Sequence, residues 1–302
     1  MKVLKPIQVT DATLTASNVP EDDAPTWLVG TTYAADDEVM LEHRVYRSVV
    51  GSNVGNDPRT DDGTKWLELG FTNRWRVFDR KVNNITEQLD TITYEFEFTN
   101  LVSGIGLLNV GAATIDVEVM DPLATVIYSR SVDRFAGTAI IDWLTFVTVD
   151  LSLEDVEDAI FDDVPGYSGN SIKITLTAEN DTSAVNIGQI LLGPVFTLGT
   201  TISGTAIGIR DFSTKERDVF GEAIILERSF ADTTTFQFHL PTISGRRVRN
   251  VLAGLRAYPS LYFASADATN IGAQTYGFFQ DFEIPLAAGG NSFANLKVVG
   301  LA

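Results

Sequence analysis

Cysteine is absent from the 302 residues, and histidine occurs only as His43 and His239. The lack of cysteine excludes disulfides, thiolate nucleophiles and Cys-ligated metals. Two histidines leave little scope for a His-based triad or a multi-histidine metal site. The sequence also lacks a Walker-type phosphate loop, a dinucleotide fingerprint, a Gly-x-Ser-x-Gly elbow and a His-Glu-x-x-His helix. We therefore expect no catalytic activity, no cofactor and no bound metal ion.

Basic residues are scarce: 22 Lys and Arg stand against 40 Asp and Glu, for a net charge of -18. This balance argues against binding to nucleic acid or to an anionic membrane surface. No secretory signal is visible at the start of the sequence. The uncharged segment 182–209 is interrupted by Gly, Pro, Thr and Ser, so it predicts consecutive buried β-strands with turns rather than a spanning helix. We expect no membrane insertion.

The negative charge is unevenly distributed along the chain. Residues 1–72, 73–200 and 201–302 carry net charges of -6, -12 and 0. Such a step indicates that different parts of the chain have different surroundings. We predict three regions with these bounds: an N-terminal segment, a β-sandwich and a small α+β assembly domain. The N-terminal segment contains a small module at about 25–70.

Strand patterns dominate the middle region. Polar and apolar residues alternate strictly over 91–98, 114–119 and 171–176, as in half-buried strands. The predicted fold is thus mainly β, with an antiparallel, jelly-roll-like sandwich over 73–200. One amphipathic helix is predicted over 151–161.

The last region mixes helix and strand. Two strands are predicted within 222–240, around Asp232-Thr233-Thr234. A helix follows over 244–257, with apolar residues at helical spacing. Strands are then expected around 261–263, 276–279 and 296–299. The polar face of the helix carries Arg246, Arg247, Arg249 and Arg256. These arginines fit either a solvated surface or an assembly interface that meets acidic regions of a neighbouring subunit.

Aromatic residues recur in the N-terminal region. The pattern comprises Trp27, Tyr33, Asp36-Asp37, Tyr46 and Trp66, with Gly55-Asn56-Asp57-Pro58 between the last two. It resembles the small carbohydrate-binding module of chitinases and related polysaccharide hydrolases. The resemblance implies a three-stranded aromatic module that stacks sugar rings on exposed aromatic side chains.

Two roles are open for the rings of Trp27, Tyr33, Tyr46 and Trp66. They fit sugar contact, as the resemblance implies. They also fit the core, because a module of this size has little room for an aliphatic interior. Arg47-Ser48-Val49-Val50 stands where that family often has an exposed Trp pair. This difference favours the core.

Several stretches outside the module resemble a group of tailed-bacteriophage virion proteins, in which such a module precedes a β-sandwich. They are Asn73–Asp79, Ile209–Ser213, Phe220–Phe230, Tyr276–Phe282 and Val298–Ala302. The resemblance implies a structural or adhesive part of the phage tail, located in the virion. Its partners would be other virion proteins, copies of itself and a bacterial surface glycan.

Two other functions are weighed against this one. The acidic runs 21–23, 36–38, 61–62 and 162–163 could supply the paired carboxylates of a glycan-degrading enzyme, although surface solvation or turn capping accounts for them far better. Asp57 with Asp61 and Asp62, or Asp158 with Asp162 and Asp163, could hold a structural Ca²⁺, but neither set has the spacing of a calcium loop. A purely structural tail or head piece without sugar binding is the other alternative.

Overall fold

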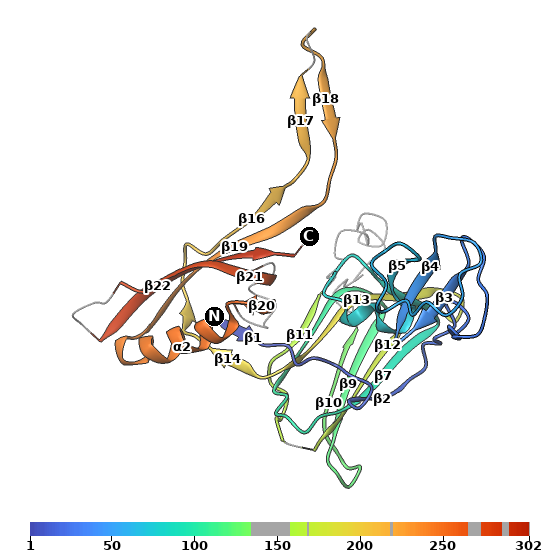
Figure 1. The fold of residues 1–302 in the computed structure, drawn as a ribbon. Helices are drawn as coiled ribbons and strands as arrows, with labels where there is room; N and C mark the ends of the chain where they lie inside the picture. The colour runs from blue at the N-terminus through green and yellow to red at the C-terminus, as the bar shows by residue number, and fades with distance from the viewer. Residues whose placement is uncertain (134–157, 168, 218–219, 265–272, 286–289, 302) are drawn as a thin grey trace, which may run out of the picture.

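The structure is a computed structural model that describes residues 1–133, 158–167, 169–217, 220–264, 273–285 and 290–301 (Figure 1). Within these residues the fold is mainly β, as predicted, and the paired strands run antiparallel. A two-sheet sandwich, a small three-stranded module and a large C-terminal sheet make up the body. A long hairpin projects from it.

The sandwich consists of a five-stranded and a four-stranded sheet. In spatial order, the first holds β10 (Val126–Asp133), β9 (Thr114–Met120), β12 (Ser171–Thr177), β7 (Thr91–Glu97) and β2 (Leu14–Ser17). The second holds β11 (Ala159–Phe161), β8 (Gly104–Gly111), β13 (Ala184–Gly193) and β6 (Thr86–Leu89).

The order of these strands is that of a jelly roll. Along the chain from β6 to β13, the strands alternate between the two sheets, except that β9 and β10 lie in the same sheet. The resulting orders, β6-β13-β8-β11 and β7-β12-β9-β10, are those of two interleaved Greek keys. Strand β2 extends the second set beyond β7. The jelly-roll-like sandwich predicted from the alternating segments is thus confirmed.

Alternation along each strand fills the space between the two sheets. In β7, Ile92, Tyr94 and Phe96 are fully buried, whereas the threonines and glutamates between them face outward. Phe78 contacts the rings of Tyr94 and Phe96 edge-on. Phe78 ends the 3₁₀ helix η1 (Asn73–Phe78), which connects the module to the sandwich.

The C-terminal sheet includes the first strand of the chain. Its path is β14 (Val195–Thr197), β1 (Lys2–Leu4), β20 (Ser260–Phe263), β21 (Gln274–Glu283), β22 (Asn291–Gly300), β19 (Phe230–Pro241) and β15 (Thr200–Thr201). Val3 pairs with Phe196 on one side and with Tyr262 on the other. The first seventeen residues therefore contribute one strand to this sheet and another to the sandwich.

Among the described residues, one α-helix packs against this sheet. After the short η3 (Thr242–Ser244), α2 (Gly245–Leu255) buries Val248, Leu252 and Leu255 against Phe236, Phe238 and Leu296. The helix predicted over 244–257 and the three following strands are confirmed. The region has the predicted α+β character.

The sandwich and the C-terminal sheet meet through an apolar contact. Leu108 and Leu191 of the sandwich pack with Leu4, Leu261 and Phe263 of the sheet. Polar contacts flank this cluster: the Lys2 ammonium pairs with Asp162, and Gln274 Nε2 donates to Asp158 Oδ2 over 2.6 Å. These apolar and polar contacts join the sandwich to the C-terminal sheet.

The projecting arm comprises two consecutive ladders of one hairpin. Strand β16 (Ala206–Asp211) pairs with the first half of β19, and β17 (Thr214–Arg217) pairs with β18 (Ala223–Leu226). Figure 1 shows the arm extending well beyond the sheet from which it arises. We call residues 206–235 the β-arm.

Three sequence predictions need correction. Residues 159–161 of the predicted helix over 151–161 form β11, because they pair with Ile105–Leu107 of β8; residues 151–157 lie outside the described part. The strand break expected at 232–234 lies at 227–229, since Thr234 is buried and hydrogen-bonded to Thr275 inside β19. Within 182–209, β13 is buried as predicted, but β16 is exposed throughout.

None of the helices described is long and apolar enough to cross a membrane.

The position of β1 leads to a testable prediction about stability. Replacement Val3→Asp places a carboxylate in a fully buried site between two strands, so we expect the free energy of unfolding to fall by about 3 kcal/mol or more. Urea unfolding followed by circular dichroism measures the loss. The control Gln8→Asp, at an exposed site, should unfold like the wild type. Equal stability of both variants would contradict the role assigned to β1.

Candidate functional site

The aromatic module folds around the rings that the sequence singled out. Strands β3 (Glu38–Leu41), β4 (Arg44–Ser48) and β5 (Trp66–Phe71) form its sheet. Tyr33, Tyr46 and Trp66 are at most 8% exposed and pack with Val39, while Trp27 lies half-buried against this cluster. The Tyr33 and Trp66 rings meet edge to face, with centroids 5.3 Å apart.

The polar ends of these rings also bind within the module. Trp66 Nε1 donates to the Asn56 carbonyl oxygen over 3.0 Å, and the Leu28 N–H donates to Tyr33 Oη over 2.7 Å. Burial raises the pKa of Tyr46, and the negative charge of Glu68 raises it further by a smaller amount. Sugar stacking needs an accessible ring face. Tyr33, Tyr46 and Trp66 therefore fill the core, and Trp27 alone of the four keeps substantial exposed surface.

Asp61 organises the turn that leads into β5. Its Oδ2 accepts the backbone N–H groups of Gly63, Lys65 and Trp66 at 2.9–3.0 Å. Desolvation raises the pKa of this carboxyl, but the N–H groups outweigh it and hold the pKa below its ordinary value. The carboxylate thus fixes the approach to β5.

A histidine attaches the module to the sandwich. His43 lies in the two-residue turn between β3 and β4, where it and Glu42 adopt positive φ angles of 66° and 48°. Its ring stacks on Trp75 of η1 at a centroid distance of 4.1 Å. Its two ring nitrogens lie 2.8 Å from Glu21 Oε1 and from Asp11 Oδ1. Both nitrogens are occupied by these structural contacts.

A groove of about 750 Å³ runs along this junction. Residues 5–11, the β3–β4 turn, η1 and strand β13 line it, together with Tyr258 and Tyr276. The carboxylates that line the groove already have partners. Asp79 accepts hydrogen bonds from the side chains of Gln189 and Asn84. Asp11 contacts the His43 ring nitrogen Nε2, and Glu42 forms an ion pair with Arg59. No pair of unengaged carboxylates faces the groove among the described residues.

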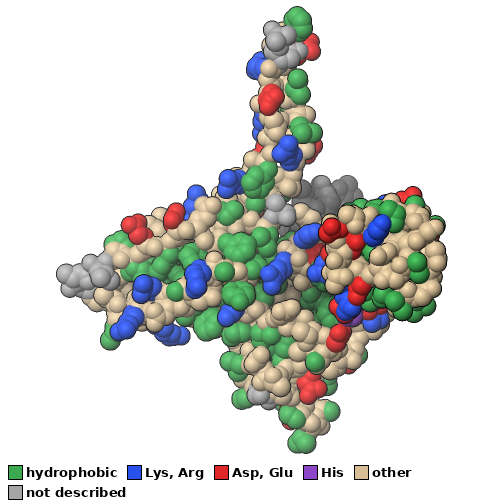
Figure 2. All heavy atoms as spheres, in the orientation of Figure 1, with side chains coloured by type: hydrophobic (Ala, Val, Ile, Leu, Met, Phe, Trp, Pro, Cys, Tyr) green, Lys and Arg blue, Asp and Glu red, His purple; other side chains and the backbone are tan. Residues whose placement is uncertain are grey.

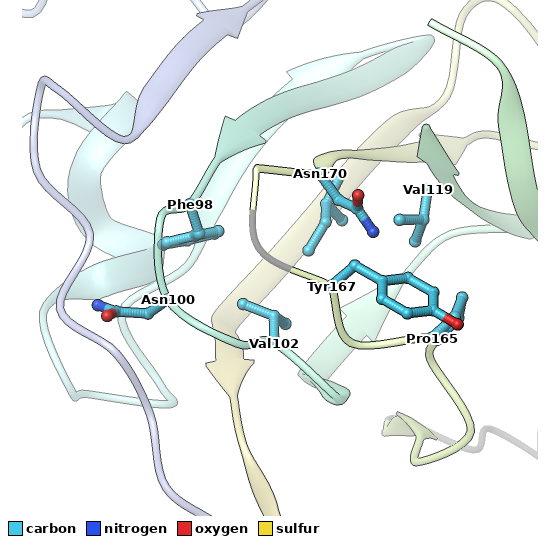
Figure 3. A pocket seen from close by; sticks show the side chains of 8 residues that line it. Phe98, Asn100, Val102, Val119, Pro165, Tyr167 and Asn170 are labelled. Carbon is cyan, nitrogen blue, oxygen red and sulfur yellow. The ribbon is translucent and has the colours of Figure 1, made fainter. Parts of the chain in front are cut away.

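The small cavity in Figure 3 lies at one end of the sandwich. Phe98, Val102, Tyr167 and Asn170 are among the residues that surround its volume of about 10 Å³. A space of that size holds at most one water molecule. It therefore has no room for a substrate.

The acidic pairs considered above serve mainly as local partners. Asp57 pairs with Arg59, Asp162 with Lys2, and Asp163 accepts from Tyr128 over 2.8 Å. Asp158 accepts the Asn109 N–H over 2.9 Å. Within the described part of the chain, no three His, Asp or Glu side chains converge as metal ligands.

The arginines of α2 lie on the surface. Arg246, Arg247, Arg249 and Arg256 are exposed, and Arg256 donates to the Ala253 carbonyl oxygen over 2.8 Å. Arg246, Arg247 and Arg249 form no ion pair with any residue that the structure describes. The first turn of α2 contains no acidic residue. Figure 2 shows basic side chains gathered over this helix.

The β-arm is a surface that the sequence did not single out. Three consecutive residues of β18, Ile224, Ile225 and Leu226, are 57%, 67% and 55% exposed. Ile207, Ile209, Phe220 and Phe230 elsewhere on the arm are also exposed. An uninterrupted apolar run normally marks a strand that is covered on both faces. The apolar run in β18 was therefore the sequence signal for this surface. On its own, however, such a run predicts a strand buried inside the chain.

Comparisons with known proteins give no relative. No protein-family model, curated protein or solved structure matches this chain.

The Asp61 turn predicts a pH-dependent stability of the module. The pKa of Asp61 in the folded module lies below the ordinary aspartate value of about 4. The carboxylate therefore stabilises the module above the ordinary value, and this stabilisation is lost as the pH falls through the folded pKa. We expect Asp61→Ala to destabilise the module by about 1 kcal/mol at pH 7. The difference from the wild type should shrink on acidification.

Near-UV circular dichroism during urea unfolding, recorded at pH 7 and at pH 3, measures this difference through the aromatic side chains. Asp22→Ala, at an exposed site, is the matched control. A difference between Asp61→Ala and the wild type that persists unchanged at pH 3 would refute the assigned role.

Proposed function

We propose that this protein is a structural component of a phage tail, present in several copies that contact one another through the β-arm. The observation that carries the proposal is the exposure of apolar residues along both strands of the arm. A two-stranded hairpin is at best marginally stable in water on its own. The arm gains a stabilising environment only when another molecule covers it.

The size of the driving force supports this role. Full burial of an Ile, Leu or Phe side chain contributes about 1.5–3 kcal/mol. Ile224 and Leu226 project to one face of the hairpin and Ile225 to the other, because strand side chains alternate. A neighbour that covers both faces therefore gains several such contributions. Contiguous apolar surface of this kind is typical of protein–protein contact sites.

The assignment to a phage tail rests on the sequence resemblance. Two of the resembling stretches, Ile209–Ser213 and Phe220–Phe230, belong to the β-arm. The arm therefore contains part of what this chain shares with the virion proteins. Copies of the chain, together with other virion proteins, are the proposed partners.

Glycan adhesion by the module is a separate hypothesis. The buried rings of Tyr33, Tyr46 and Trp66 do not support it, so adhesion would have to use Trp27 and the neighbouring exposed Leu28 and Val29. The structural role that we propose does not depend on sugar binding. A chitin pull-down of the full chain tests adhesion, and loss of polysaccharide viscosity tests the enzymatic alternative.

The β-arm predicts how self-association responds to mutation. The double substitution Ile224→Glu, Ile225→Glu puts a charge on each face of β18. We expect it to weaken self-association in sedimentation velocity by at least about tenfold while changing the free energy of unfolding by no more than about 0.5 kcal/mol, because both residues are exposed in the single chain.

The control is Val54→Glu, Leu89→Glu, the same kind of change at two exposed apolar residues outside the β-arm, which should associate like the wild type. Association of the double variant at wild-type affinity would overturn the proposed function. A wild-type chain that stays monomeric at every concentration tested would also overturn it.

A further inference from the structure

We propose that α2 of one copy docks on the outer face of the sheet β10-β9-β12-β7-β2 of a second copy, with arginines of the helix meeting carboxylates of the sheet. This inference rests on the proposed function, because it names a second contact between the assembled copies. It is independent of the β-arm in the residues that it uses.

The outer face of this sheet is acidic and lies outside the sandwich core. Glu95 and Glu97 of β7, and Asp116 and Glu118 of β9, project from it between the buried positions of their strands. Strand β12 between them supplies one cation, Lys173, whose Nζ lies 3.2 Å from Glu95 Oε1. Glu97, Asp116 and Glu118 form no ion pair with any residue in the described ranges. This face therefore carries a net negative charge.

The cations of α2 are placed where the isolated helix does not favour them. Arg246, Arg247 and Arg249 occupy the N-terminal half of α2, near the positive end of the helix dipole. No acidic residue in the first turn offsets them, and Ser244 makes no side-chain capping bond. Because these positions do not stabilise the helix electrostatically, an anionic partner surface gives their charges a role.

The two surfaces also match in length. Arg246, Arg249 and Arg256 follow at i, i+3 and i+10, so they line one flank of the helix over about 15 Å. On the sheet, Glu97 of β7 and Asp116 of β9 lie on either side of β12, two strand spacings apart. The pairing register offsets them by four residues along the strand direction. This corresponds to a diagonal of about 16 Å. The carboxylates at the two ends of this diagonal can thus each face an arginine, with Lys173 of β12 lying between them.

A second copy is the partner that this charge complementarity favours. The same chain carries both the basic helix and the acidic sheet, and the two surfaces belong to different parts of the molecule (Figure 1). A contact between two unlike surfaces is heterologous, so it repeats from copy to copy and produces a ring or a filament. Arginine and carboxylate groups form the bidentate pairs that fix the register of such a contact.

Charge reversal on each surface tests the proposal. The helix variant is Arg246→Glu, Arg249→Glu, and the sheet variant is Asp116→Lys, Glu118→Lys. We expect each variant alone to self-associate at least about tenfold more weakly than the wild type, because like charges then face each other. An equimolar mixture should regain association, since the acidic helix of the first variant faces the basic sheet of the second. Association of the wild type should weaken with added salt.

Matched controls carry the same charge changes elsewhere on the surface. Arg80→Glu, Lys81→Glu has the charge change of the helix variant, and Glu179→Lys, Asp181→Lys has that of the sheet variant; all four positions are exposed. Both controls should associate like the wild type. Far-UV circular dichroism and thermal unfolding establish that every variant is folded.

The outcomes separate this inference from the proposed function. If the helix and sheet variants associate normally, or if their mixture fails to regain association, the docking of α2 is wrong. The β-arm substitutions still test the structural role in that case. A wild-type chain that remains monomeric overturns both proposals. Binding of an anionic polymer by these arginines, without self-association, overturns the docking of α2.

Discussion

Strand β1 is the element on which the arrangement of the molecule depends. Its three residues are hydrogen-bonded on both edges, to β14 and to β20, and Val3 and Leu4 are completely buried. Strand β1 precedes the sandwich in the chain and β14 follows it, and the two strands pair with each other in the C-terminal sheet. Gly193 lies where these two connections meet: a Cβ there would be 2.0 Å from the Lys5 carbonyl oxygen, which is too close for any side chain. This close contact fixes the sandwich against the C-terminal sheet, and the module follows through η1.

Local pattern was sufficient to predict several of the regular elements of this fold. The alternation over 91–98 and 171–176, and the helical spacing of Val248, Leu252 and Leu255, each correspond to an observed element. The pairing of β1 could not be predicted, because three residues carry no periodic signal and their partners lie near residues 196 and 262. Strand β11 was missed for a similar reason: its structure is decided by pairing with β8.

The candidate surfaces were predictable to different degrees. The arginines of α2 were identified from the sequence, since a helix with one apolar face must expose the other. The rings of Tyr33, Tyr46 and Trp66 were open to two roles, and only the folded module shows which faces are covered. The β-arm could not be inferred, because Ile224-Ile225-Leu226 has the pattern of an ordinary interior strand. Its exposure is a property of tertiary structure.

The pairing of β1 also has a consequence for the order in which the protein is made. On the ribosome, all strands of the jelly roll have been synthesised by residue 193, whereas the partner of Lys2 in β20 is residue 263. Domains generally fold as units during synthesis. The sandwich can therefore fold while β1 still lacks one of its two neighbouring strands. Translation must proceed some seventy codons beyond the sandwich before this strand acquires its final place.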